Sequence, residues 1–123
     1  MKIRVIKYDS VDSTNNVAIR RIKKGKIEPT LIIANSQKKG RGQYGRRWLS
    51  YKGNIFMTVY FNFKKNIKIK SISKKVYTTL KKSLEKFVNE KVTIKFPNDL
   101  LIKGSKVCGI LQETITYNND KYL

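Results

Sequence analysis

The sequence predicts an α+β fold, in which strands and helices follow one another along the chain. Residues 54–63, NIFMTVYFNF, alternate between two faces, which is the period of a β-strand. Residues 71–90 change to a helical period, with an apolar side chain at every fourth position and lysines between them. Residues 30–34, TLIIA, are apolar throughout, which favours a buried strand. At 123 residues, the chain has the length of one domain with a core of its own.

The N-terminal quarter of the chain predicts a strand followed by a helix. Residues 2–8, KIRVIKY, alternate well enough to form the strand. Residues 9–16, DSVDSTNN, then offer several N-cap side chains for a helix that continues through VAIRRIKKGK. Ala18 and Ile22 share one face of that helix, and Gly25 can end it in a left-handed cap.

The C-terminal half of the chain predicts short strands joined by turns. Residues 92–96, VTIKF, form a strand, and Pro97-Asn98-Asp99 forms a turn. Residues 103–106, KGSK, separate two apolar runs and indicate a hairpin. After a further turn at residues 118–120, KYL resembles the opening of another strand. Because the sequence stops there, we expect a C-terminal part of the fold to be missing.

The charge of the chain is its most extreme property. A formal net charge of +20 predicts a polyanionic partner, such as nucleic acid, a phosphorylated ligand or an acidic protein. The excess of Lys, Ile, Asn and Tyr is also what an AT-rich genome produces, so codon bias is an alternative source of the charge. The chain has no histidine and one cysteine, so Lys, Arg, carboxylates and backbone amides must carry any chemistry. No apolar run is long enough for a membrane span and no signal peptide opens the chain, which predicts a cytoplasmic protein.

Residues 40–48, GRGQYGRRW, match the dinucleotide fingerprint GxGxxG in their first six letters. A Rossmann turn is excluded because no helical period follows and no acidic residue stands between Glu28 and Glu85. No P-loop motif is present either. The glycines nevertheless let backbone N–H groups approach an anion, and arginines bind carboxylate or phosphate with two hydrogen bonds. We therefore expect an anion-binding loop that is disordered when empty, with a solvated basic turn as the alternative.

Three segments together resemble the catalytic domain of the biotin protein ligase family, the biotin–[acetyl-CoA-carboxylase] ligases. They are DSTNNVA (12–18), NSQKKGRGQYGRRWLSYKGNI (35–55) and KFPNDLLIKGSKVCGIL (95–111). They match the family's STN motif, its GRGxxGRxW loop, and its PND turn followed by K-x-x-GIL, in this order. The resemblance spans about residues 5–117.

The resemblance implies a mixed β-sheet with helices packed on one face, truncated before the last strands. It implies that residues 1–123 are one incomplete catalytic domain, without an N-terminal helix-turn-helix and without the small SH3-like C-terminal domain. The implied reaction uses ATP and Mg²⁺ to convert biotin into biotinyl-5′-AMP. A lysine of the biotin carboxyl carrier protein of acetyl-CoA carboxylase then takes up the biotinyl group. No membrane partner is implied.

The resemblance also assigns roles to individual residues. Arg41 and Lys106 would be catalytic, because each meets the carboxylate and phosphate oxygens. The implied biotin-binding residues are Ser13, Thr14, Asn15, Gln37, Arg41, Gly42, Gln43, Lys106 and Gly109. The implied nucleotide-binding residues are Gly40, Arg46, Trp48, Asn98 and Asp99, and Asp99 is also the candidate Mg²⁺ ligand. The alternatives from the residues alone are helix capping for Ser13, a core position for Trp48 and an ordinary turn for Asp99.

The sequence differs from the family pattern at residues 43 and 44 of the glycine-rich loop. Gln43 and Tyr44 stand where many family members have arginines, which predicts weaker retention of the adenylate intermediate. An inactive or partial ligase remnant is therefore one alternative, and a lipoate or octanoate transferase of the same fold is another. A nucleic-acid-binding protein is the alternative from a different class, and it would show affinity that falls steeply with salt.

Overall fold

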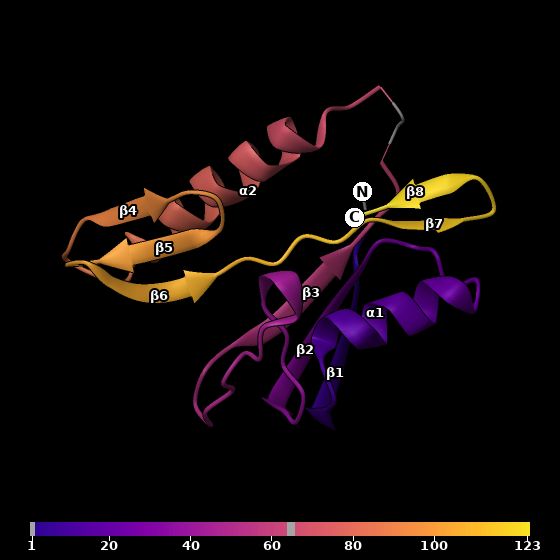
Figure 1. The fold of residues 1–123 in the computed structure, drawn as a ribbon, viewed down its shortest axis with the longest axis horizontal. Helices are drawn as coiled ribbons and strands as arrows, with labels where there is room; N and C mark the ends of the chain where they lie inside the picture. The colour runs from indigo at the N-terminus through magenta and orange to yellow at the C-terminus, as the bar shows by residue number, and fades with distance from the viewer. Residues whose placement is uncertain (1, 64–65) are drawn as a thin grey trace. The chain divides into compact units, whose positions relative to one another are not determined.

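A computed structural model describes residues 2–63 and 66–123 of the chain (Figure 1). The described residues form two compact units: unit 1 comprises residues 2–63 and 112–123, and unit 2 comprises residues 66–111. The strands are β1 (Arg4–Val11), β2 (Thr30–Gln37), β3 (Phe56–Tyr60), β4 (Val92–Lys95), β5 (Asp99–Ile102), β6 (Ser105–Gly109), β7 (Ile115–Tyr117) and β8 (Asp120–Tyr122). The helices are α1 (Thr14–Lys23) and α2 (Ile69–Leu84), with a short 3₁₀ turn at Gln43–Gly45.

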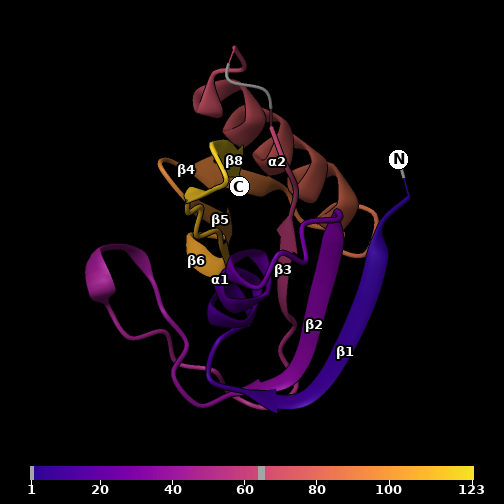
Figure 2. The same cartoon turned by 90° about the vertical axis from the view of Figure 1, so that its right-hand side faces the viewer.

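Unit 1 is built on a three-stranded sheet of order β1-β2-β3 (Figure 2). Strands β1 and β2 are parallel, whereas β2 and β3 are antiparallel, so the predicted mixed sheet is confirmed. The parallel pair requires a crossover connection, which α1 supplies. In this register Val11 at the end of β1 lies opposite Gln37 at the end of β2. The end of β2 is therefore placed beside the start of α1.

Helix α1 begins and ends as its sequence predicts. The Ser13 side chain caps the N-terminus by accepting a hydrogen bond from the Asn16 N–H at 3.3 Å. Gly25 follows the helix with φ +73°, the left-handed conformation that glycine adopts without a Cβ penalty. Ala18 and Ile22 are 4% and 2% exposed, which confirms the shared apolar face.

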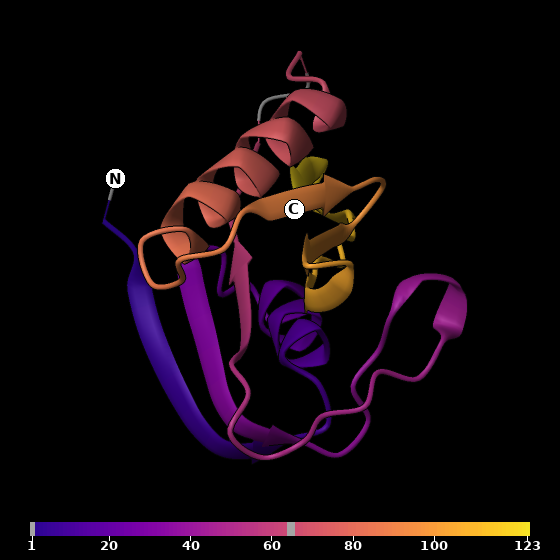
Figure 3. The same ribbon diagram turned by 90° about the vertical axis from the view of Figure 1, so that its left-hand side faces the viewer.

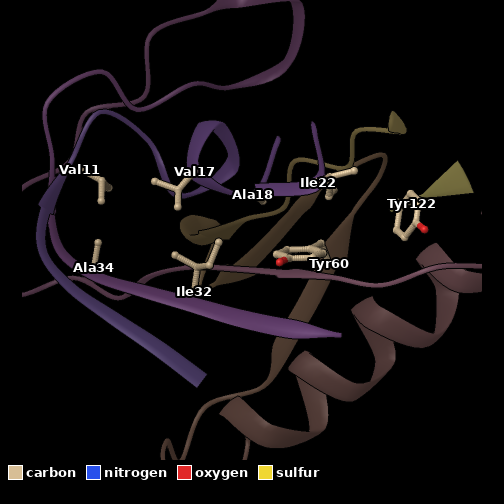
Figure 4. Close-up of a cluster of buried hydrophobic side chains, with 8 residues drawn as sticks. All are labelled: Val11, Val17, Ala18, Ile22, Ile32, Ala34, Tyr60 and Tyr122. Carbon is tan, nitrogen blue, oxygen red and sulfur yellow. The ribbon is translucent and has the colours of Figure 1, made fainter. Parts of the chain in front are cut away.

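The core of unit 1 lies between α1 and one face of the sheet (Figure 4). Its members are Val11, Val17, Ala18, Ile22, Ile32, Ala34, Tyr60 and Tyr122. The strand predicted over residues 54–63 is shorter than expected, and it buries Phe56 and Tyr60 on one face. Met57 and Val59 on the other face of β3 are exposed. The reason is that α1 packs on the face that carries Tyr60.

The C-terminal residues of the chain complete unit 1. Strands β7 and β8 form an antiparallel hairpin, with Asn118 and Asn119 at φ 49° and 65° in the turn. Two positive φ values in a two-residue loop match the twist of a hairpin, and Asn tolerates them. The Phe61 and Leu123 backbones exchange two hydrogen bonds of 3.1 Å, and Tyr122 is 1% exposed. The strand expected in the last residues is thus present.

Unit 2 contains helix α2 and the antiparallel sheet β4-β5-β6 (Figure 3). The helix ends at Leu84, six residues before the predicted end at Glu90. The turn predicted after β4 is present at residues 96–98, and Lys103 and Gly104 form the β5–β6 hairpin turn with positive φ. Three side chains of unit 2 are buried below 6% exposure, namely Tyr77, Val92 and Leu100.

Within the described part of the chain, neither helix has the length and apolar character required to cross a membrane.

Candidate functional site

The polar side chains at the start of α1 meet the end of β2. The Gln37 Oε1 atom accepts hydrogen bonds from the Thr14 backbone N–H at 2.8 Å and from the Thr14 hydroxyl at 3.2 Å. Ser13 and Thr14 are only 2% and 4% exposed. Burial of these polar groups is tolerated because each is hydrogen-bonded. The structure therefore brings together three of the residues that the family resemblance assigned to biotin.

Thr58 of β3 extends this cluster to a second strand. Its hydroxyl donates toward Thr14 Oγ1 at 2.8 Å and also lies within hydrogen-bond distance of Asn15 Oδ1. A hydroxyl has one proton, so the two acceptors share it. The side chains of Thr14, Asn15 and Thr58 are thus held in fixed orientations above the sheet.

The glycine-rich loop is folded back on itself by backbone hydrogen bonds. The Gly42 N–H donates to the Arg46 carbonyl at 2.7 Å, and the Trp48 N–H donates to the Gly40 carbonyl at 2.8 Å. Arg41 and Arg47 form an isolated antiparallel bridge between the two arms of the loop. We expected a loop without fixed structure unless an anion is bound. The structure instead shows a defined loop, and the chain itself supplies an anion to it.

That anion is the carboxylate of Glu113, which lies between β6 and β7. Arg41 donates to it with two nearly parallel hydrogen bonds, from Nη1 to Oε1 at 2.8 Å and from Nη2 to Oε2 at 2.7 Å. The Asn15 amide donates to Oε2 of the same carboxylate at 2.9 Å. The Arg41 guanidinium and the Asn15 hydrogen bond lower the pKa of Glu113, although its burial opposes the shift. The Arg41 side chain therefore binds a carboxylate with the two-pronged geometry that the sequence predicted.

A second carboxylate, that of Asp12, supports Arg41 indirectly through Asn16. The Arg41 Nε–H donates to Asn16 Oδ1 at 2.9 Å, and the Asn16 amide donates to Asp12 Oδ2 at 3.0 Å. Asp12 in turn accepts two hydrogen bonds of 2.8 Å from Arg20. The Arg20 guanidinium holds the pKa of Asp12 well below its usual range. This chain of contacts runs within unit 1 from helix α1 to the loop and fixes the direction of the Arg41 side chain.

Gly40 allows the loop to approach its neighbours closely. A Cβ atom at this position would lie 2.6 Å from Ser50 Oγ, 2.8 Å from the Trp48 carbonyl oxygen and 3.0 Å from Gln37 Nε2. The Gln37 amide also donates to Ser50 Oγ at 3.2 Å. The absence of a side chain at Gly40 is therefore required by packing around Gln37.

The tip of the loop carries the candidate residues that are most exposed. Gln43 lies in the short 3₁₀ turn, Arg46 is exposed, and Tyr44 is 92% exposed with φ 57°. Gly42 and Trp48 are half-buried. Within the described part of the chain, neither the Gln43 nor the Arg46 side chain forms a hydrogen bond. Their assigned roles toward biotin and nucleotide therefore remain predictions.

The other four candidate residues lie in unit 2. Lys106 of β6 forms an ion pair of 2.8 Å with Asp99 of β5, and the register sets Asp99 opposite Gly109. The Asn98 carbonyl accepts from the Ile110 N–H at 2.8 Å, which fixes the turn before β5. Asn98, Asp99 and Gly109 thus lie at the end of the β5–β6 pair away from the turn, whereas Lys106 stands opposite Leu101 nearer the turn and reaches Asp99 with its side chain.

Asp99 does not form a metal centre with other residues of the described chain. No group of three or more acidic, cysteine or histidine ligands occurs among residues 2–63 and 66–123. The Lys106 ammonium occupies one oxygen of the Asp99 carboxylate. Mg²⁺ is commonly held by one or two carboxylates together with substrate phosphates and water, so Asp99 alone would be the protein's contribution to such a site, and its role as a Mg²⁺ ligand stays a prediction.

The sequence reasoning missed four residues of the unit 1 network. These residues are Asn16, Ser50, Thr58 and Glu113. Thr58 could have been found, because it is a polar residue on the same strand face as Phe56 and Tyr60. Glu113 is one of only eight acidic residues in the chain and follows the GIL segment directly after Gln112. No spacing in the sequence indicates that Glu113 would contact Arg41 of the glycine-rich loop.

The fold and the site define an α+β protein with a buried polar network and a carboxylate-binding arginine. The family model that matches residues 8–122 is the Biotin/lipoate A/B protein ligase family. The chain therefore belongs to the biotin/lipoate A/B protein ligase family.

Curated relatives agree with this membership. The chain is 31% identical over 106 residues to the bifunctional ligase/repressor BirA of Escherichia coli K12, covering 84% of this chain and 32% of that protein. It is 31% identical over 111 residues to BirA of Bacillus subtilis, covering 89% of this chain and 34% of the relative. The chain thus spans about a third of the length of these relatives.

Solved structures share the fold. A biotin acetyl coenzyme A carboxylase synthetase from Helicobacter pylori, with bound biotinylated ATP, matches with a TM-score of 0.77 and 24% identity over 98% of this chain and 58% of that one. A biotin protein ligase from Aquifex aeolicus, in complex with biotin and ATP, matches with a TM-score of 0.70 and 26% identity over 97% of this chain and 49% of that one. These matches confirm the predicted catalytic-domain-like α+β fold.

Proposed function

We propose that this chain binds biotin and ATP and supports ATP-dependent attachment of biotin to a lysine of a biotin carboxyl carrier protein. The observation that carries the proposal is the two-pronged contact of Arg41 with a carboxylate, beside the buried Thr14 and the half-buried side chains of Asn15 and Gln37. Family membership over residues 8–122 supports it, as do the relatives solved with biotin and ATP. The intermediate that follows from the family resemblance is biotinyl-5′-AMP.

The first chemical problem of this reaction is electrostatic. The carboxylate of biotin must approach the α-phosphate of ATP, and both groups are anionic. Positive groups already in position lower the energy of that approach, because they need no reorganisation as charge develops. Arg41 is such a group, since Asn16 and the Asp12–Arg20 pair fix its direction. We assign Lys106 the same task from unit 2, where Asp99 holds its ammonium group.

Biotin also has a neutral ureido ring with two N–H donors and a carbonyl acceptor. Thr14, Asn15 and Gln37 offer hydroxyl and amide groups of both kinds, and Ser13 holds the helix start beneath them. Gly42, Gln43 and Gly109 complete the proposed biotin set. A buried site whose polar groups would be left unpaired by other ligands discriminates strongly for the matching ligand.

The resemblance assigns nucleotide-binding residues in each unit separately. In unit 1 they are the backbone at Gly40, the Arg46 guanidinium and the Trp48 ring. In unit 2 they are Asn98 and Asp99. The resemblance implies Mg²⁺ as a companion of ATP, and Asp99, beside Lys106, would be the residue that holds it together with the phosphates of ATP. The metal would screen the negative charge of the phosphates, and location in the cytoplasm is also part of the proposal.

The test is biotin-dependent exchange of pyrophosphate into ATP by the purified protein. Arg41→Ala and Lys106→Ala should each reduce the exchange by about 100-fold, the usual cost of one preorganised charged contact. Lys39→Ala in the same loop and Lys91→Ala before β4 make the same charge change at exposed positions and should leave the exchange near the wild-type rate.

The outcomes separate the alternatives. Biotin binding measured by calorimetry without exchange would indicate a partial ligase that holds biotin but does not activate it. Lipoate that competes with biotin at equal concentration would favour the lipoate branch of the same family, which the family model also covers. A protein that neither binds biotin nor exchanges pyrophosphate would overturn the proposal.

A further inference from the structure

Glu113 occupies the position at Arg41 that an anionic ligand would take. Its carboxylate accepts three hydrogen bonds of 2.7 to 2.9 Å, two from Arg41 and one from Asn15. Both donors belong to the proposed biotin set, whereas Glu113 belongs to none of the sets assigned above. The pair is half-buried, with 31% of the Arg41 side chain and 29% of the Glu113 side chain exposed.

Arg41 has no second pair of neighbouring N–H donors to offer to a ligand. A guanidinium has five N–H donors, of which Nε–H is directed at Asn16 and one on each terminal nitrogen at Glu113. A carboxylate or phosphate needs two neighbouring donors for the two-pronged contact. The end-on pair from Nη1 and Nη2 is taken by Glu113. An anionic ligand can therefore gain this contact only by replacing the Glu113 carboxylate.

Glu113 is the partner that is free to move. Arg41 is held by Asn16 and by the backbone bridge of the loop. Residues 110–114 lie outside every helix and strand, so few backbone contacts hold Glu113 in place. Displacement then costs the chain one partly exposed ion pair, which is a small free energy.

The loop carries several positive charges and no negative one, so an anion from elsewhere in the chain would stabilise it. Between Glu28 and Glu85 the sequence contains no acidic residue, while Lys38, Lys39, Arg46 and Arg47 lie beside Arg41. These like charges repel one another unless a counter-ion is present. Glu113 reaches this loop from the far end of the sequence, 72 positions from Arg41.

We propose that Glu113 is the internal counter-ion of the Arg41 site, which holds the loop of residues 38–50 folded without ligand and is displaced by the carboxylate or phosphate of the ligand. This proposal deepens the proposed function and rests on it for the identity of the ligand. Before binding, Glu113 positions Arg41 and the loop, and during binding it competes with the ligand anion for Arg41. Removal of the Glu113 carboxylate should therefore loosen the loop and, at the same time, raise the affinity of the site for an anionic ligand.

The first experiment measures loop order without ligand. Trypsin cleavage after Arg46 and Arg47 should be at least about threefold faster in Glu113→Gln and Glu113→Ala than in the wild type, since one partly exposed ion pair is lost. Asp120→Asn makes the same charge change in the neighbouring strand β8 and should be cleaved at the wild-type rate. Unchanged cleavage in both Glu113 variants would overturn the proposal.

The second experiment compares biotin with biotinamide, in which the carboxylate is replaced by a neutral amide. Glu113→Gln should bind biotin about fivefold more tightly than the wild type and should bind biotinamide with unchanged affinity, because only the anion competes with Glu113. Weaker binding of biotin, or an equal change for both ligands, would show that Glu113 only supports the site and would overturn the proposal. Should the wild type bind neither ligand, the proposed function fails, and the cleavage experiment by itself decides whether Glu113 orders the loop.

Discussion

The two units of this protein hold their candidate site residues in different ways. In unit 1 the site lies directly on a hydrophobic core, and side chains from α1, β2, β3 and the loop are joined by consecutive hydrogen bonds. In unit 2 the site rests on the Asp99–Lys106 ion pair of a hairpin, above a core of few fully buried side chains. In the proposed function, unit 1 supplies the polar groups for the neutral ring and one cation, Arg41, whereas unit 2 supplies the second cation, Lys106. Unit 1 therefore has more groups to hold in fixed orientations than the single ion pair of unit 2.

The largest expected effect comes from removing one core side chain in each unit. Ile32 and Leu100 are both 0% exposed, so Ile32→Ala and Leu100→Ala should each lower the free energy of unfolding by about 2–5 kcal/mol. Hydrogen exchange measured by mass spectrometry should show the larger loss of protection in unit 1 for Ile32→Ala and in unit 2 for Leu100→Ala. Val59→Ala and Val107→Ala remove methyl groups at exposed positions and serve as matched controls. Equal loss of protection in both units from either core substitution would argue against the two-unit description.

A smaller effect separates a glycine that is required by packing from one that is required by its backbone angle. Gly40→Ala should weaken biotin binding by about tenfold, because overpacking costs about 1–3 kcal/mol and the new Cβ meets the Trp48 carbonyl oxygen, which a side-chain rotation cannot move. Gly104→Ala in unit 2 meets no atom within 4 Å but has φ +77°, so it should lose about 1 kcal/mol of stability and retain biotin affinity. Calorimetric titration and thermal unfolding of both variants provide the comparison. A Gly40→Ala variant with wild-type affinity would show that the loop can widen around Gln37 without cost.

A single hydroxyl tests how much the polar network of unit 1 depends on each member. Thr58→Val keeps the shape of the side chain but removes the donor shared by Thr14 and Asn15, which should weaken biotin binding by about fivefold, or about 1 kcal/mol. Thr93→Val is the counterpart in unit 2, where the hydroxyl lies on an exposed strand position 3.5 Å from the Leu101 carbonyl. Its effect on binding should be too small to measure. If Thr58→Val and Thr93→Val bind biotin with the same affinity, the Thr58 hydroxyl does not contribute to ligand recognition.

The sequence predicted the elements better than it predicted the connections between them. Strand and helix periods located β1, α1, β2 and β3 because each repeats over several residues within one element. The end of α2 was placed too late because Val88 continues the four-residue spacing after the helix has stopped. The family motifs assigned Thr14, Gln37 and Arg41 to biotin, which stays a prediction, and the structure joins Thr14 to Gln37 directly and Arg41 to Asn15 through Glu113. The Arg41–Glu113 contact could not be predicted, because it depends on how residues 110–114 return to unit 1, and no local pattern records that path.

The smallest expected effect is a difference between the two units in their response to pH. The pKa values of Glu113 and Asp12 in unit 1 are lowered by their arginine partners. A carboxylate with a lowered pKa in the folded state stabilises the fold above its ordinary pKa of about 4, and this contribution is lost as the pH falls further. In unit 2, burial raises the pKa values of Tyr77 and Cys108. Their contribution is complete below their ordinary pKa values of about 9 to 10 and is lost as the pH rises through the raised values. Acid should therefore loosen unit 1 first, and alkali should loosen unit 2 first.

The chain contains one natural reporter for each unit, so this difference can be measured without labels. Trp48 is the only tryptophan and lies in unit 1, and Cys108 is the only cysteine and lies in unit 2. Trp48 fluorescence should change below about pH 4, and the change should be reduced in the double variant Asp12→Asn, Glu113→Gln, which lacks the two arginine-paired carboxylates of unit 1. Above about pH 10 the reaction of Cys108 with a thiol reagent should accelerate beyond the rise seen in the unfolded chain, and Tyr77→Phe should reduce that excess. The expected size is below about 1 kcal/mol for each group, because solvent reaches all of them in part. If the Trp48 and Cys108 signals change together at both ends of the pH range, the two units respond as one. The contrast between the hydrogen-bond network of unit 1 and the single ion pair of unit 2 would then have no energetic basis.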